Sequence, residues 1–589
     1  MQISPIQQAE FDVTNICYLC NEIITVEDST RGAKHRDHCH YTGAYLGAAH
    51  LVCNQARQVD KHLPIIFHNL TKYDGNILLE TLCKKEKNLW RVNVIPKTLE
   101  SYSSISTAKF RFIDSCQHLS HPLDVLVNNL TANGTSQTHI KLLKKYVDSK
   151  HGGSPRKLSL LSRKGVYPYT YMDSMDRFTE TELPERRFFY NDLSGEAISN
   201  EDWNHVNAIW TEFNLQNLGE LHDLYVESDV LLLGDVFEKY RTLTYKTYGL
   251  DPIHFYSLPG LSFEACLKAT GVKLELIKDP EIHMMIERGI RGGVSTITHR
   301  HAQANHEGLS SFNKETERSH LLLVDANNLY GWAMSEKQPI RGFRFMKDIK
   351  HITSEWIRSY DDSSDVGYFL EVDIEIPDHL HDSTSEYPLC PEKIEVNETM
   401  ISGISKSMRA ARGDSSNFSS EKLAPNLYPK KNYVVHVRNL KFYLEKGAVL
   451  TKVHRVLCFE QEAWILKYIK MNTDLRRMAL DEFERSFYKM LNNAFFGKTM
   501  ENVRKHIKVV LISNALAHQW QTSKPGFVRF VIISNNLVAV ELVKPNVVLN
   551  KPIYVGFTIL ELSKLHMFQF HYDTIKVNYP GSMSTLCFT

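Results

Sequence analysis

The chain has 589 residues, enough for several domains, and 43% of them are hydrophobic, an ordinary fraction for proteins with large buried cores. Its formal net charge of +1 gives no general attraction to polyanions, so nucleic-acid binding would depend on local patches. No apolar run approaches the ~20 residues of a membrane-spanning helix, and the N-terminus is too polar for a secretory signal. We therefore expect a soluble, intracellular protein of the nucleus or cytoplasm, with no membrane partner.

Residues 1–62 are rich in cysteine, histidine and turn residues. Two pairs spaced as Cys-x-x-Cys and His-x-x-Cys lie in this region: Cys17, Cys20, His50 and Cys53. Such pairs can form a tetrahedral Zn²⁺ site. A small segment with little hydrophobic core needs a bound metal of this kind to stabilise its fold. Cys39 and His40 are further candidate ligands, so the sequence leaves the identity of the four open. A chance cluster is the less favoured interpretation.

The same region resembles the treble-clef HNH nucleases of the recombination endonuclease VII type. Those nucleases carry Asp-His-x-His-x-Thr-Gly and later a zinc ligand followed by Asn; here the chain has residues 37–43, DHCHYTG, and Cys53-Asn54. The resemblance implies that His38 is a general base and that Asp37 and Asn54 help to hold a catalytic metal. This chain has His50 at a position where those nucleases usually have Cys, and zinc accepts either residue as a ligand. We favour a structural zinc module over an active nuclease.

Residues 63–245 alternate short apolar strands with helical patterns, which predicts an α/β domain. We expect strands at Leu63–Phe67 and Phe110–Ile113, and helices at Ser199–Phe213 and Leu221–Leu243. The basic stretch from Lys141 to Lys164 is interpreted as a solvated helix face followed by a loop.

Two polar motifs in this domain suggest metal-dependent exonuclease chemistry. Asn69 and Asp74 follow the first strand, where a carboxylate is well placed to hold a metal, and Tyr225 and Asp229 share a helix face. Two-metal exonucleases use several carboxylates, and a tyrosine orients the attacking water. Taken singly, each motif is better explained by a structural role than by catalysis: the Asn by a turn, and the Tyr by a position at the edge of the core. Together they resemble the second and third exonuclease motifs of family B DNA polymerases, which implies catalytic roles for Asp74, Tyr225 and Asp229, and DNA contact by Asn69.

The first exonuclease motif, Asp-x-Glu, does not occur in residues 1–68. Without it the site lacks up to two metal ligands. We therefore expect 3′–5′ exonuclease activity to be weak or absent.

Residues 319–589 begin with the apolar run Leu321–Val324, a predicted strand that ends at Asp325 and is followed by Tyr330. A buried strand ending in a turn fits this run equally well. In the amphipathic stretch Glu482–His506, three residues spaced by four form one stripe on a helix: Lys489, Asn493 and Gly497. A lysine there can neutralise a triphosphate, and a glycine lets another surface approach closely.

Taken in order, these motifs resemble the protein-primed family B DNA polymerases of the mobile-element (Polinton or Maverick-like) type. The resemblance implies that Asp325 binds catalytic Mg²⁺, and that the sugar and phosphates of the incoming nucleotide meet Tyr330, Lys489, Asn493 and Gly497. Gly292 and Gly293, in the connector 246–318, would contact the template. The implied partners are template and primer DNA, deoxynucleoside triphosphates, and a terminal protein primer that docks on an insertion near 366–439. Departures from the motifs are Asn328 and Ala494 for Ser, and Phe496 for Tyr.

The polymerase motif Tyr-x-Asp-Thr-Asp is missing. Tyr572-Asp573-Thr574 ends a helical pattern, Ile559–Tyr572, and Ile575 stands where the second Asp belongs. We therefore expect a chain that stops just before its second catalytic carboxylate and the thumb, and that polymerises DNA barely or not at all. The alternatives are a catalytically dead DNA- or nucleotide-binding remnant of a transposon, and a zinc HNH-type nuclease.

The expected fold is an α+β multidomain protein. It comprises a zinc treble clef over 1–62, an RNase H-like α/β exonuclease domain over 63–245, the connector over 246–318, and an incomplete polymerase palm with fingers over 319–589. The palm should be an antiparallel sheet.

Overall fold

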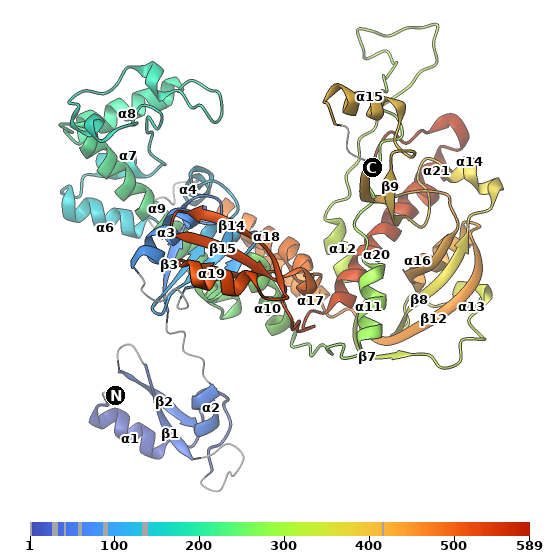
Figure 1. Cartoon of the computed structure of the whole chain (residues 1–589), viewed down its shortest axis with the longest axis horizontal. Helices are drawn as coiled ribbons and strands as arrows, with labels where there is room; N and C mark the ends of the chain where they lie inside the picture. Colours follow the sequence, from blue (N-terminus) through green and yellow to red (C-terminus); the bar gives the residue numbers. More distant parts are fainter. Residues whose placement is uncertain are drawn as a thin grey trace.

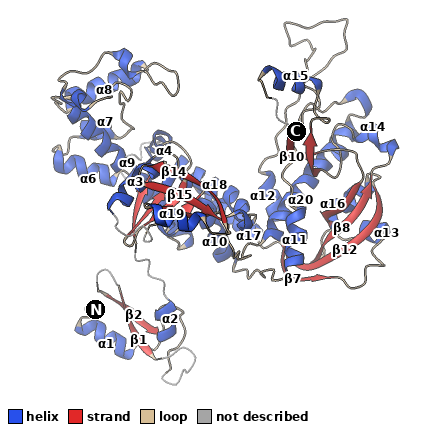
Figure 2. Cartoon of the chain, in the orientation of Figure 1, coloured by secondary structure: helices blue, strands red, loops and turns tan. Residues whose placement is uncertain are grey.

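The computed structural model describes residues 3–25, 33–39, 43–56, 62–85, 92–131, 139–414 and 418–589. Figure 1 shows a small N-terminal module, a central body with an attached helical lobe, and a second sheet-containing lobe. Figure 2 shows that helices and strands are mixed in the module, the central body and the second lobe. Within the described residues, none of the helices combines the length and the apolar character needed to cross a bilayer.

The N-terminal module consists of a helix, a hairpin and a second helix. They are α1 (Pro5–Val13), the antiparallel strands β1 (Lys34–His38) and β2 (Tyr45–His50), and α2 (Leu51–Ala56). Ser4 caps α1 in a reciprocal pair with Gln7. The buried core is small: Phe11, Cys17, Ile24, Tyr45, Ala48 and Ala49. Because β2 leads directly into α2, His50 and Cys53 lie within one turn of each other.

The central body contains a four-stranded sheet in the order β3 (Leu63–Phe67), β6 (Phe110–Asp114), β5 (Tyr102–Ser106), β4 (Asn93–Pro96). β3 and β6 are parallel and the other pairs are antiparallel. Both predicted strands are confirmed. α3 (Asp74–Lys85) follows β3, and α4 (Leu123–Thr131) follows β6.

A helical lobe extends from this body (Figure 1). It contains α6 (Lys141–Lys150), α7 (Pro155–Leu161), α8 (Asn200–Glu212) and the long α9 (Leu218–Tyr248), which runs back toward the body. The two predicted helices are confirmed as α8 and α9. α9 begins at the cap Asn217 and ends at Gly249, whose φ of 62° is left-handed.

A second sheet packs on the central body although it is distant in sequence. It has the order β13 (Lys508–Ile512), β15 (Leu537–Leu542), β14 (Phe527–Ser534), with α19 (Ala515–Thr522) beside it. Its Leu511 and Leu537 share a core with Leu79 and Ile105 of the first sheet region. No sequence pattern predicts this docking, because only tertiary packing joins the two segments.

The second lobe is built on an antiparallel four-stranded sheet, which confirms the antiparallel sheet expected in this half of the chain. The order is β11 (Lys430–His436), β8 (Val366–Glu375), β12 (Val449–Glu462), β7 (Gln338–Phe345). The largely buried α20 (Ile553–Gln569) lies against it with α11 (Pro280–Gly289), α12 (Leu329–Ser335) and α16 (Val437–Glu445). Between β8 and β11 the chain forms α14 (His381–Thr384), the hairpin β9 (Glu392–Asn397) and β10 (Ser419–Ala424), and α15 (Gly403–Ala411). α13 (Ser354–Arg358) joins β7 to β8.

Three helices join the lobes. They are α10 (Leu258–Thr270), α17 (Leu466–Met478) and α18 (Glu482–Thr499), and α18 confirms the helix expected over 482–506, although it ends at Thr499. α20 is followed by a π-helical turn, Phe570–Ile575, and the short α21 (Lys576–Asn578). Asp573 thus lies on a helical turn, as expected, where it pairs with Lys446.

The predicted strand Leu321–Val324 is wrong. These residues have no regular secondary structure, and their side chains are 54–79% exposed. A strand needs a hydrogen-bonded neighbour, and none of the strands in the described part of the chain pairs with this segment. An apolar run identifies a strand only when a partner is available.

Candidate metal and nucleotide sites

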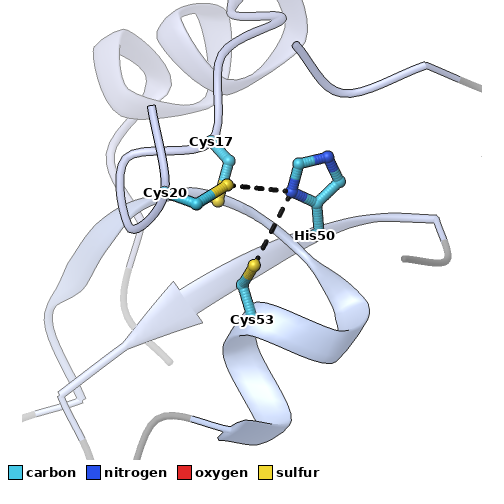
Figure 3. A group of neighbouring side chains, drawn as sticks. All are labelled: Cys17, Cys20, His50 and Cys53. Carbon is cyan, nitrogen blue, oxygen red and sulfur yellow. Dashed lines mark hydrogen bonds between the residues drawn. The ribbon is translucent and has the colours of Figure 1, made fainter. Parts of the chain in front are cut away.

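The four expected zinc ligands come together in the N-terminal module (Figure 3). The ligand atoms of Cys17, Cys20, His50 and Cys53 all lie within 4.8 Å of one another. His50 Nε2 lies 3.3 Å from the carbonyl oxygen of Ile23, so a proton on Nε2 leaves Nδ1 for a metal. Nδ1 is 3.5 Å from Cys20 Sγ and 3.7 Å from Cys53 Sγ. Cys39 is outside this group, and His40 lies outside the described residues.

The chemistry of the four side chains suits zinc. Burial opposes ionisation of the Cys17 thiol, but backbone hydrogen bonds from His50, Cys20 and Leu19 outweigh it and lower the pKa to about 6. Burial and the neighbouring thiols of Cys20 and Cys17 raise the pKa of Cys53 to about 11, because a second thiolate beside the first is unfavourable without a cation. The thiolate is the form of cysteine that binds a metal, and a bound cation favours it at each of these positions. A set of three sulfurs and one imidazole nitrogen is typical of structural zinc sites.

The predicted nuclease residues lie in the same module, where Asp37 and His38 pair with Gly47 and Tyr45 across the hairpin and Asn54 follows Cys53. Asp37 is 2% exposed and accepts hydrogen bonds from the Tyr18 hydroxyl and, at 2.7 Å, from the backbone N–H of His38. His38 ends β1 and Asn54 lies on α2. The carboxylate of Asp37 is therefore engaged inside the module.

The turn after β3 is organised by the carboxylate of Asp114, for which the sequence motifs predicted no role. Asp114, buried at the end of β6, accepts hydrogen bonds from the backbone N–H groups of Asn69 (2.9 Å) and Thr71 (3.0 Å). Burial raises its pKa, but these hydrogen bonds prevail and the net shift is downward. Asn69 adopts a left-handed φ of 77°, and Asp74 begins α3 at the far end of the turn.

Tyr225 and Asp229 face the segment 164–169. The Tyr225 ring stacks on Tyr167 with centroids 4.9 Å apart, and its hydroxyl shares a hydrogen bond with that of Tyr169. Burial raises the pKa of Asp229, against the opposing charge of Lys164. Among the described residues, Asp74 and Asp229 do not belong to any group of three or more metal-ligand side chains.

The lysine-bearing helix presents the expected stripe to solvent. Lys489, Asn493 and Gly497 are exposed on one side of α18, while Phe487, Leu491 and Phe495 are buried on the other. A Cβ added at Gly497 would meet no atom within 4 Å, so the surface there is open. The stripe is free to receive a ligand.

Three segments far apart in sequence converge beside this stripe. The Tyr330 ring, on α12, stacks on Phe496 of α18 with centroids 4.7 Å apart and planes at 15°. A Cβ added at Gly293 would lie 3.9 Å from the Tyr330 hydroxyl. Asp325 is exposed and precedes α12 by a short turn. Phe496 therefore supports the predicted nucleotide residue Tyr330, a role that no local signal in the sequence shows.

α18 is anchored on the long helix α9. Lys239 Nζ lies 3.1 Å from Asp481 Oδ2 and 2.8 Å from Glu484 Oε1, and all three side chains are largely buried. Burial lowers the pKa of Lys239, but the two carboxylates outweigh it and the pKa is raised. Asp481 also caps α18 through the backbone N–H of Glu484, at 2.8 Å. The helix that carries Tyr225 and Asp229 thus also holds the start of the helix that carries Lys489.

Comparison with known proteins defines the family. Residues 58–575 match the family model "DNA polymerase type B, organellar and viral", so the chain belongs to this family. The family is one of DNA-directed DNA polymerases, which supports DNA binding and DNA replication as the functional context of the chain. No curated protein matches the chain.

Solved structures of phi29 DNA polymerase also resemble the chain. Its orthorhombic crystal form is 11% identical, covers 87% of this chain and 69% of its own, and has a TM-score of 0.45. Its complex with primer–template DNA is 12% identical, with 90% and 72% coverage and a TM-score of 0.46.

Proposed function

We propose that this chain is a DNA-directed DNA polymerase of the protein-primed, mobile-element type, and that it binds the incoming nucleotide between α12 and α18. The observation that carries the proposal is the convergence of Tyr330, Phe496 and Gly293 beside the exposed stripe that begins at Lys489. Template and primer DNA, deoxynucleoside triphosphates and a terminal protein primer are the proposed partners.

The residues of this site have distinct tasks. The Lys489 ammonium, exposed on a rigid helix, neutralises the triphosphate. Lys489 and Gly497 are about 12 Å apart along the helix, and Asn493 between them offers an amide to the nucleotide. Tyr330 has one ring face against Phe496, which fixes its position, so the ring can lie under the sugar and exclude a 2′-hydroxyl.

Asp325 would hold Mg²⁺ together with phosphate oxygens of the substrate, the kind of ligand set that this ion accepts. The ion, when bound, stabilises charge on the transferring phosphoryl group. Among the described residues, no three candidate ligands gather around Asp325. Tyr572-Asp573-Thr574 does not supply a second carboxylate of this kind, because Asp573 is paired with Lys446 and Ile575 follows Thr574. We therefore propose that this chain binds DNA and nucleotide but transfers nucleotides slowly.

The remaining sites support this role. Zn²⁺ in the N-terminal module is structural, because its four ligands converge while Asp37 is already engaged by Tyr18. Residues 1–68 contain no Asp-x-Glu pair that could join Asp74 and Asp229 in holding metal ions, which supports weak proofreading as part of the proposal.

Binding of a fluorescent deoxynucleoside triphosphate to the full chain on primer–template DNA tests the proposal. Lys489→Ala should weaken nucleotide binding about tenfold or more, the effect of losing one charged hydrogen bond. Lys470→Ala is the matched control, since Lys470 is an exposed lysine of the neighbouring α17. If the unmodified chain binds no nucleotide, or if both variants bind equally, the proposed site is wrong.

Primer extension in Mg²⁺ tests the catalytic claim separately. The chain should extend a primer barely, and Asp325→Asn should abolish what remains. Rapid extension by the unmodified chain would refute slow transfer while leaving the binding site intact.

A further inference from the structure

A basic face on α6 is not used by any of the sites above. Lys141, Lys144 and Lys145 are exposed on one side of this helix, and with Asp148 and Ser149 they line a shallow surface hollow. On the other side Leu143 and Val147 are buried in the core. The lysines are therefore presented by a packed helix and not by a loose loop.

The helix is held in this orientation by α9. The buried carboxylate of Asp235 accepts hydrogen bonds from the backbone N–H groups of Leu142 (2.9 Å) and Leu143 (3.1 Å). These are N–H groups at the start of α6, where a helix has no internal partners for them. Asp235 thus neutralises no lysine side chain and only fixes the helix that carries them.

The three lysines differ from the other cations of the same lobe. Lys150 is paired with Glu227 at 2.8 Å, Arg156 with Glu212 at 3.0 Å, and Arg163 with Glu201 at 3.1 Å. Within the part of the chain that the structure describes, none of the three has an ion pair with an acidic side chain, and residues 132–138 contain no acid in the sequence. Asp148 reduces the charge of the face without removing its excess of positive charge.

The position of the face connects it with the proposed polymerase site. His139, just before α6, has Nε2 3.8 Å from Oδ2 of Asp481, the residue that caps α18. α6 and α18 therefore begin next to each other. α18 continues from there through exposed Arg485 to Lys489.

We propose that the face of Lys141, Lys144 and Lys145 binds the phosphodiester backbone of DNA that extends from the polymerase site onto the helical lobe. Lysines three and four apart on a helix are neighbours on its surface and can contact successive phosphates. Such contacts are independent of base sequence. The inference rests on the proposed function, which brings DNA to α18.

The test measures binding of the full chain to labelled single-stranded and duplex DNA over a range of salt concentrations. The variant Lys141→Gln/Lys144→Gln/Lys145→Gln removes three charges without touching a buried group. Because each phosphate contact to single-stranded DNA adds about 0.7 to the slope of log K against log salt, the slope should fall by about 2. If the variant and the unmodified chain bind equally at 1 M salt, this difference in slope makes the variant bind roughly 100-fold more weakly at about 0.1 M salt.

The matched control is Lys347→Gln/Lys350→Gln/Lys452→Gln, which removes three exposed lysines of the second lobe. Its slope should equal that of the unmodified chain. A loss confined to the single-stranded or to the duplex arm identifies which form of DNA lies on the face. Equal slopes for the unmodified chain and the α6 variant, or equal losses in both variants, overturn the inference. If the unmodified chain binds no DNA at all, the proposed polymerase function fails as well.

Discussion

Replacing Lys239 by Met should loosen α18 from α9. The lysine side chain is 12% exposed, and its partners Asp481 and Glu484 are 3% and 18% exposed, so solvent screens these ion pairs little. Met keeps the length of the side chain but removes the permanent positive charge between two carboxylates, and only His139, whose Nε2 lies 3.8 Å from Asp481 Oδ2 and whose pKa is lowered by burial, remains beside them. Removing one partner of a buried ion pair costs about 3–5 kcal/mol. Because Asp481 also retains its capping hydrogen bond to Glu484, we expect the lower end, about 3 kcal/mol.

Hydrogen–deuterium exchange of peptides from α18 measures this loss locally, which a global unfolding curve of a multidomain chain cannot do. The opening free energy of α18 should fall by about 3 kcal/mol in Lys239→Met. Lys246→Met, at an exposed position of the same helix, should have an effect within about 0.5 kcal/mol.

A compensated variant separates charge from packing. In Lys239→Met/Asp481→Asn/Glu484→Gln the unpaired charges are gone, and the asparagine side chain introduced in place of Asp481 can still cap the helix, so most of the lost protection should return. If Lys239→Met exchanges like Lys246→Met, or if the compensated variant is no better than Lys239→Met, the ion-pair argument is refuted.

Two further predictions concern the zinc module and a buried histidine. Removing metal with a chelator, or substituting Cys53→Ala, should unfold the N-terminal module, since structural Zn²⁺ contributes about 10–16 kcal/mol and the core is small. Protease resistance of the metal-free module would contradict this. Burial lowers the pKa of His118 to about 4. As pH falls below about 6.5, His118 binds a proton in the unfolded chain but stays neutral in the folded chain until about pH 4. The free energy of unfolding should therefore fall by about 3 kcal/mol between these pH values. His118→Gln, whose amide can keep the hydrogen bonds to Tyr240 and Phe255, should lack this loss. The opening free energy of peptides around residue 118, from hydrogen–deuterium exchange at pH 7 and 4.5 corrected for the intrinsic pH dependence of exchange, measures it; an unchanged pH dependence in the variant would count against the argument.

The periodicity of apolar residues and the spacing of polar residues were enough to predict the local structure. The helical pattern of 482–506 predicted α18 and the common face of Lys489, Asn493 and Gly497, because residues four apart share a helix face wherever the helix lies. The Cys-x-x-Cys and His-x-x-Cys pairs predicted the four clustered metal-ligand side chains for a similar reason, since each pair lies on one short stretch of chain. Capping and turn residues such as Asn217 and Gly249 set the ends of α9.

Contacts between distant segments were decided only by the tertiary structure. The stack of Tyr330 on Phe496 and the docking of β13, β14 and β15 on the first sheet join residues separated by long stretches of chain. The run Leu321–Val324 is the opposite case, a local preference that the tertiary structure did not realise. Its composition favours a strand, but no strand in the described residues pairs with it. The preference of a segment for helix or strand depends on residues close to it in the sequence. A sheet or a binding site also needs a partner surface, and that surface exists only after the chain has folded.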